Sequence, residues 1–325
     1  MIQKILKFLL PLLFGVGLIL FLMSKVDTAA VMEVIRQGIN WWWVLLSCVL
    51  ATLSHVARGI RWRMQLATVG GHPTTHQMSV SVFGNYGMNL VFPRLGEIWR
   101  CNYVSSITGL PFTTTVGTMI SERIADMILM GLIALLAFVL QSHVFINFFA
   151  ENGGAGENVV HMLLSPWPYL LLALMFVGVW AGHRYLRNWS PYRYVASLVG
   201  NLWQGALSLL QLPHFWPYLL WSVIIWGLYF LNTWIQFYFF DFTSHLGVLA
   251  ALSVFTMGSL SQLAPVQGGL GAWHFMVIFA LCCYGIDETQ AVSFALVSWF
   301  LEQGFVLILG LYAMIYTMLS KHTKS

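Results

Sequence analysis

Six apolar runs, each about long enough to cross a lipid bilayer, constrain the fold of this chain most strongly. A helix needs about 20 residues to span a hydrocarbon core of about 30 Å. With 59% hydrophobic and 8% charged residues, the 325-residue chain lies outside the composition range of soluble domains. We therefore predict an all-α polytopic membrane protein, with residues 1–325 forming a single membrane domain. The predicted spans are Ile5 to Met23, Trp41 to Ala57, Thr113 to Leu140, Trp167 to Ala181, Trp216 to Phe240 and Ala291 to Leu319.

Basic residues beside these runs predict the orientation of the chain. The positive-inside rule places such residues in the cytoplasm, so we expect both termini to be cytoplasmic and the protein to lie in the cytoplasmic (inner) membrane. The first run lacks a convincing small-residue cleavage site and is interpreted as a retained span. Residues 186–212 combine arginines with aromatic residues and predict an interfacial helix on the cytoplasmic face. The orienting residues are Lys4, Lys7, Arg58, Arg61, Arg63, Arg184, Arg187, Arg193, Lys321 and Lys324.

The charge and the cysteines exclude some classes of function. The formal net charge of +4 is small and spread over several loops, so no nucleic-acid partner is expected. The four cysteines fall in apolar segments without metal-ligand spacing, so we interpret them as inert residues of the protein interior. No cofactor and no metal are expected.

Two further apolar segments are interrupted before they are long enough to cross the membrane. Met78 to Gly109 is broken at Phe92 to Gly96, and Leu246 to Gly285 is broken at Leu263 to Gly271. Proline removes a backbone donor and glycine permits a sharp turn, which membranes tolerate only where protein or water satisfies the backbone. Each segment therefore predicts a re-entrant helical hairpin. In the predicted topology, the two hairpins enter the membrane from its opposite sides. The alternative is eight or nine ordinary spans in which the prolines are kinks.

Each hairpin precedes a long span, which suggests an inverted repeat. Residues 76–141 form the first unit and residues 245–319 the second. Trp99-Arg100 in the first aligns with Trp273-His274 in the second, and Glu122 or Asp126 then corresponds to Glu302. Paired interrupted segments in two halves of a membrane protein point to a transport site near the middle of the bilayer.

Charged residues inside these apolar segments predict the functional site. A charged group in the middle of a bilayer costs about 2.5–3.5 kcal/mol, so such residues favour a polar cavity. Arg94, Glu97 and Arg100 recur at helical spacing, and Glu122 and Asp126 are four residues apart on one face. Arginine suits phosphate, while the carboxylates hold the arginines or exchange protons. The alternative is that these groups only pair among themselves and stiffen the bundle. The candidate substrate-binding residues are Arg94, Glu97, Arg100, Glu122, Arg123, Asp126, Asn89, Gln262, His274 and Glu302.

Three stretches carry a resemblance to a known family. The stretches Asn89 to Arg100, Ser121 to Asp126 and Pro265 to Gly271 resemble the flippase-like membrane-domain family of lysylphosphatidylglycerol synthase. The resemblance implies a membrane domain that translocates or otherwise handles lipids. Some relatives also carry a soluble aminoacyl-transferase domain, for which this chain has no room, so synthase activity is not expected. His274 and Glu302 depart from the residue types common in relatives, which leaves open whether they form a pair.

The function hypothesis is a flippase-like transporter that moves a lipid with an anionic headgroup between leaflets. The partners expected are such membrane lipids, whether phospholipid or polyprenyl-phosphate-linked, with a lipid-modifying enzyme as a possible further partner. The sequence contains no phosphate-binding loop, nucleophile elbow or zinc motif, so enzymatic activity is not expected. The alternatives are a membrane-embedded enzyme acting on lipid headgroups and a scaffold for a partner synthase.

Overall fold

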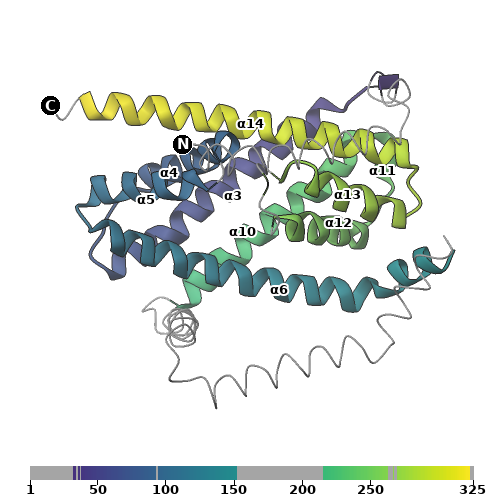
Figure 1. The fold of residues 1–325 in the computed structure, drawn as a ribbon, viewed down its shortest axis with the longest axis horizontal. Helices are drawn as coiled ribbons and strands as arrows, with labels where there is room; N and C mark the ends of the chain where they lie inside the picture. Colours follow the sequence, from purple (N-terminus) through teal and green to yellow (C-terminus); the bar gives the residue numbers. More distant parts are fainter. Residues whose placement is uncertain are drawn as a thin grey trace, which may run out of the picture.

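The computed structural model describes residues 32, 33, 36, 38–92, 94–151, 215–262, 266 and 269–322, and its regular elements there are all helical (Figure 1). The predicted spans Ile5 to Met23 and Trp167 to Ala181, and the predicted interfacial helix at 186–212, lie outside the described residues.

Four long helices correspond to the other four predicted spans. Each is long and apolar enough to cross a membrane, and large apolar side chains are exposed along their outer faces. The all-α membrane fold is therefore confirmed. The four helices are α3 (Trp41–Thr68), α6 (Phe112–Glu151), α10 (Phe215–Gln236), which continues into η1 (Phe237–Phe239), and α14 (Glu288–His322).

Two pairs of short helices occupy the two interrupted segments. The first pair is α4 (Thr75–Val91) and α5 (Leu95–Thr108), and the second is α12 (Val248–Ser261) and α13 (Ala272–Cys283). At 1.5 Å per residue, helices of 17, 14, 14 and 12 residues are too short to cross a core of about 30 Å. The pairs lie toward opposite ends of the long helices (Figure 1). The four-residue helix α11 (Asp241–Ser244) precedes the second pair.

The two pairs share a local packing arrangement. In the first, the ring of Trp99 on α5 lies directly over Gly84 of α4, so that a methyl group at Gly84 would overlap the ring. In the second, Trp273 of α13 lies over Gly258 of α12, where an added Cβ would come 2.8 Å from the indole nitrogen. Glycine and tryptophan are 15 residues apart in both pairs, since 99 − 84 and 273 − 258 are equal. This common arrangement supports an internal repeat.

Local sequence explains where the first pair begins, turns and ends. Thr74 and Gln77 form a reciprocal cap: the Thr74 hydroxyl accepts from the Gln77 backbone at 3.2 Å, and the Gln77 side chain accepts from the Thr74 backbone at 2.8 Å. Between the helices, Arg94 adopts a left-handed conformation with φ of 63°, which is uncommon for a residue with a Cβ. Gly109 ends α5 with φ of 73°.

Helix α14 packs against α4 at a contact between two glycines. An added Cβ on either Gly87 or Gly310 would lie 2.6 Å from the Cα of the other. The backbones therefore touch without intervening side chains, as small residues permit in membrane helices.

Two hydrophobic clusters lie at the two ends of the bundle. One is centred on α12, α13, the end of α10 and the start of α14, and includes Phe237, Phe294 and Leu281. The other joins α3, α4 and α5 to the later part of α14 and includes Trp62 and Met78.

Candidate functional site: a buried charge cluster

Five charged side chains from three helices meet inside the protein. Arg58 and Arg61 come from α3, Arg100 from α5, and Glu122 and Asp126 from α6. Their exposed fractions are 3%, 0%, 0%, 0% and 8% respectively. These five residues are called the buried charge cluster below.

Glu122 lies at the centre of this cluster and faces three guanidinium groups. Its Oε1 is 2.9 Å from Nε of Arg58 and 3.2 Å from Nη2 of Arg61. Its Oε2 is 3.0 Å from Nη1 of Arg100. The three ion pairs hold α3, α5 and α6 together through one carboxylate.

Asp126 lies one turn along α6 and binds the same two arginines of α3. It accepts a hydrogen bond from Nη2 of Arg58 and another, at 2.7 Å, from Nη2 of Arg61. Helices α3 and α6 are therefore joined by four charged contacts between two arginines and two carboxylates.

Hydroxyl groups surround the arginines of α3. Nη1 of Arg58 donates to the hydroxyls of Tyr86 and Tyr229, each at 3.3 Å, and Nη1 of Arg61 donates to Ser222 at 3.1 Å. Through these bonds α4 and α10 also form walls of the cluster. The polar environment stabilises charges that an apolar interior would exclude.

Arg100 differs from the other two arginines because its hydrogen-bonding capacity is largely unused. Its guanidinium lies 3.8 Å from the centre of the Trp62 ring, a cation–π contact. Among the described residues, its Nε and Nη2 have no hydrogen-bond partner. Two buried donors therefore remain available to an anion or to water.

The buried charge cluster carries a surplus of positive charge. Three arginines and two carboxylates give 3 − 2 = +1.

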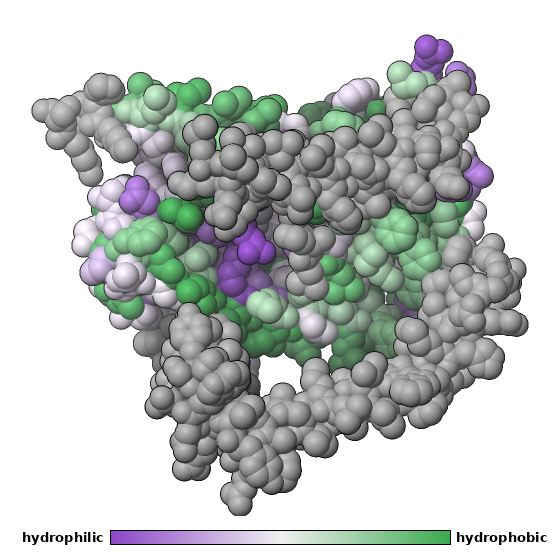
Figure 2. All heavy atoms as spheres, in the orientation of Figure 1, coloured by the Kyte–Doolittle hydropathy of each residue, from purple (hydrophilic) through white to green (hydrophobic). Residues whose placement is uncertain are grey.

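On the surface, Figure 2 shows hydrophilic side chains near the middle of one face, with hydrophobic residues on both sides.

Glu97 and Arg123 form a separate pair at the edge of the site. Their closest atoms are 3.3 Å apart, and their side chains are 25% and 37% exposed. The pair is balanced in charge and links α5 to α6. Screening by solvent makes such a pair weaker than the contacts of Glu122.

Arg94 and Asn89 lie at the turn between α4 and α5. The prediction that Arg94 shares a helix face with Glu97 and Arg100 is wrong, because α5 begins only at Leu95 and Arg94 precedes it in the left-handed conformation. Arg94 is exposed. Asn89 supports the turn: its Oδ1 accepts a hydrogen bond from the Gly96 backbone at 2.8 Å.

The candidates from the second half of the chain lie apart from the buried charge cluster. Gln262 is exposed at the end of α12. His274 is 1% exposed, and its Nδ1 accepts from the Gly271 backbone at 3.4 Å. Glu302 accepts a hydrogen bond from the Gln236 amide at 3.2 Å. His274 and Glu302 thus have different partners.

The sequence interpretation of Arg58 and Arg61 as loop residues is wrong. They were predicted to follow the second span in a short basic loop, but α3 continues to Thr68 and buries both side chains. The spacing of these arginines along the sequence did, however, indicate a buried helix face. Together with Gln65 they lie at i, i+3 and i+7, the period of one helix face, and all three are buried.

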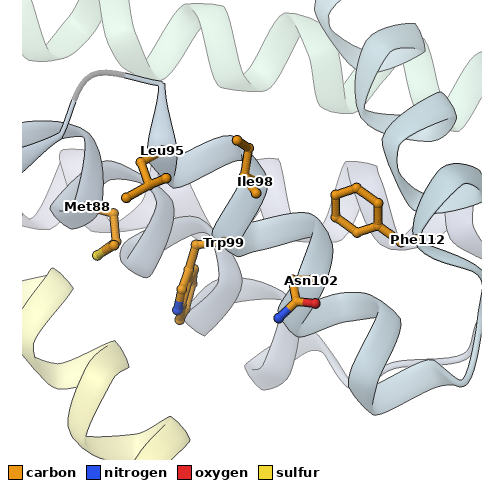
Figure 3. Close-up of a pocket in the computed structure, with 6 residues that line it drawn as sticks. All are labelled: Met88, Leu95, Ile98, Trp99, Asn102 and Phe112. Atoms are coloured by element: carbon orange, nitrogen blue, oxygen red, sulfur yellow. The ribbon is translucent and has the colours of Figure 1, made fainter. Parts of the chain in front are cut away.

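A second feature near the site is an open apolar pocket of about 430 Å³ beside the α4–α5 turn. Figure 3 shows that its lining side chains come from α4, from α5 and from the first residue of α6. Its volume lies in the range of small-molecule sites. The lining residues are Met88, Leu95, Ile98, Trp99, Asn102 and Phe112.

Comparison with known proteins gives one match. A family model described as the lysylphosphatidylglycerol synthase TM region matches residues 8–310, most of the chain. No curated protein and no solved structure was found to match. Within the described residues, no group of three or more His, Cys, Asp and Glu side chains converges on a possible metal position.

Proposed function

We propose that this chain, which belongs to the family of lysylphosphatidylglycerol synthase TM regions, moves lipids with an anionic headgroup between the leaflets of the cytoplasmic membrane. The family name refers to a lipid, and the fold is that of an integral membrane protein, so handling of a membrane lipid is the expected general role. Transport is the specific activity that the buried charges favour.

The observation that carries this proposal is the surplus charge of the buried charge cluster. Mutual pairing accounts for two arginines and two carboxylates, but it leaves one positive charge and the free donors of Arg100. An unbalanced buried charge is costly unless a ligand completes it. A phosphate group supplies the missing negative charge and accepts hydrogen bonds from a guanidinium.

The carboxylates have a separate role in this proposal. When no lipid is bound, Glu122 and Asp126 hold the arginines in place. When the headgroup enters, its phosphate takes the free donors of Arg100, while the acyl or prenyl tails remain in lipid. The apolar pocket beside the α4–α5 turn offers a surface for part of a tail. Movement of the two short helix pairs, at opposite ends of the bundle, exposes the headgroup to either leaflet in turn.

The first prediction tests Arg100. In Arg100→Gln the buried charge cluster becomes neutral, so the remaining pairs are balanced and folding should be preserved. We expect lipid exchange to fall about tenfold or more, because a hydrogen bond to a charged group contributes about 1.5–3 kcal/mol. The measurement uses phosphatidylcholine vesicles that contain the protein and a trace of fluorescent phosphatidylglycerol, with a reductant that quenches only the outer leaflet.

Arg63→Gln is the matched control. Arg63 lies on α3 and is exposed, where it donates to Thr75 at 2.8 Å. We expect this variant to exchange lipid at the wild-type rate. Normal exchange by folded Arg100→Gln protein would argue against the proposed role of the buried charge cluster.

The same vesicles separate the alternative functions. A membrane-embedded enzyme would form a new lipid species, detectable by mass spectrometry, and a scaffold for a lipid-modifying enzyme would show neither a product nor exchange. Exchange without a product is the outcome expected for a transporter.

A further inference from the structure

The two long helices that follow the two short pairs each carry an acid, and the two acids have very different surroundings. Glu122 of α6 faces three arginines. Among the described residues, Glu302 of α14 accepts a single hydrogen bond, from the neutral amide of Gln236 at 3.2 Å. In the part of the chain that the structure describes, no Lys, Arg or His side chain forms an ion pair with Glu302.

Glu302 lines a small, partly open void of about 10 Å³ between α3, α10, η1 and α14. Ser298 lines the same void, is 0% exposed, and its hydroxyl has no hydrogen-bond partner among the described residues. A buried hydroxyl group therefore lies unpaired beside Glu302 in the described part of the chain. The other polar lining residues are already bonded: Ser47 donates to Asn232 at 2.6 Å, and Gln236 donates to Glu302.

The surroundings of Glu302 favour the neutral acid over the carboxylate. An ionised carboxylate at membrane depth needs a cation or several donors, and the described part of the chain supplies a single amide donor. A neutral carboxylic acid also has a hydroxyl group to donate. The Ser298 oxygen, or a water molecule in the void, is available as the acceptor, since the void is close to the volume that one water requires.

The geometry points to Glu302 as a proton-binding site that couples lipid movement to proton movement, an inference that rests on the proposed transport function. The Glu302 carboxylate takes a proton from water on one side of the membrane and forms the neutral acid. It releases that proton to water on the other side and becomes a carboxylate again. Glu302 is partly exposed, so part of the residue lies at the protein surface.

The lining of the void favours a proton over a metal cation. Hard cations such as Mg²⁺ and Ca²⁺ need a shell of oxygen ligands. Around Glu302, however, most of the lining is apolar and includes Val44, Ala51, Phe239 and Leu301. Cys48 of α3 is the other titratable group that lines the void, and the lining residues from α10, η1 and α14 add no further titratable group besides Glu302 itself.

The first test detects the proton itself and does not depend on transport. Infrared spectra of the wild-type protein at about neutral pH should contain the carbonyl band of a protonated carboxylic acid, as expected when desolvation disfavours the charged form. Glu302→Gln should lose this band and should fold normally, because glutamine has the shape of the neutral acid. Glu288→Gln is the matched control, since Glu288 is exposed on the same helix, and it should keep the band. An identical band in wild type and Glu302→Gln would overturn the inference.

The second test measures the coupling. In vesicles with a fluorescent phosphatidylglycerol probe, wild-type exchange should change by about tenfold over about two pH units, as expected when the rate follows the protonated fraction of one group. Glu302→Gln should change by less than about twofold over the same range. Exchange that depends on sodium instead, or that ignores pH in the wild type, would overturn the inference but leave the proposed function intact. Absence of any exchange by the wild type would count against the proposed function. In that case, the infrared comparison alone would show whether Glu302 binds a proton.

Discussion

Glu122 is the residue on which the buried charge cluster depends. It pairs with Arg58, Arg61 and Arg100, and its side chain is fully buried. Loss of its charge would leave Asp126 as the one carboxylate of the cluster and Arg100 without its ion pair, which raises the net charge of the cluster from +1 to +2. Removal of one partner from a buried ion pair destabilises a protein strongly because the other charge stays buried.

We therefore predict that Glu122→Gln lowers the free energy of unfolding by about 3–5 kcal/mol. Glu97→Gln is the comparison, because Glu97 pairs with Arg123 at the exposed edge of the site, where an ion pair contributes about 0–1 kcal/mol. Thermal unfolding of both variants in detergent measures the difference. Equal losses in the two variants would show that Glu122 does not hold the cluster together.

The sequence reveals the carboxylates of this cluster but not two of its arginines. Glu122, Asp126 and Arg100 are conspicuous because they interrupt apolar segments. Arg58 and Arg61 instead follow an apolar run, where basic residues normally mark the cytoplasmic end of a span. Their burial results from the packing of α6 and α10 around α3, and this tertiary contact is not encoded in local sequence.

At the scale of the helices, apolar length predicts the long elements well and their ends less well. The four described spans are confirmed, yet α3 ends at Thr68 instead of Ala57, and α6 runs to Glu151. Neither extension contains a proline, so the helix continues beyond the apolar run. The breaks near Arg94 and Gly271 were recognisable because proline and glycine occur together there.

The glycine contact between α4 and α14 gives an element-scale prediction. Gly87→Ala places a methyl group 2.6 Å from the Cα of Gly310, so the helices must separate. We expect a loss of about 1–3 kcal/mol from overpacking, partly offset by about 1 kcal/mol of gained helix propensity. Unfolding in detergent, followed by circular dichroism, measures the net effect.

Gly304→Ala is the matched control on α14. An added Cβ at Gly304 has no neighbour within 4 Å in the described part of the chain, so only the gain in helix propensity, up to about 1 kcal/mol, is expected. A stabilising effect of the same size from Gly87→Ala would mean that the close contact is not needed.

At the scale of the whole molecule, the two short helix pairs lie toward opposite ends of the bundle (Figure 1). If the long helices cross the membrane, the loop before α4 and the loop before α14 then face opposite compartments. Exposed residues in these loops include His72 and Asp287. Basic residues nearer the first loop favour the cytoplasm for that end.

We predict that a cysteine at His72 reacts only from the cytoplasm and a cysteine at Asp287 only from outside, in a background where the four native cysteines are replaced. Labelling of intact cells and of inverted vesicles with a membrane-impermeant maleimide measures this. Reaction of both positions from the same side would refute the inverted arrangement of the two units.

Sequence reasoning could find the two units but not the full composition of the buried charge cluster. Proline, glycine and short apolar length mark each helix pair, and the shared Gly-Trp spacing of 15 residues supports their relation. The buried charge cluster, by contrast, draws on α3, α5 and α6, with walls from α4 and α10. Its composition follows from how five helices pack, which periodicity along one segment does not specify.

The meeting of Gly87 and Gly310 has a mechanical consequence for the bundle. Because the two backbones touch there, the distance between α4 and α14 is fixed at this point, and any tilt of α14 relative to α4 must occur about it. A tilt displaces the two ends of a rigid rod in opposite directions. The part of α14 beside α13 and the part beside α5 would therefore move in opposite directions, with the contact between Gly87 and Gly310 as the pivot.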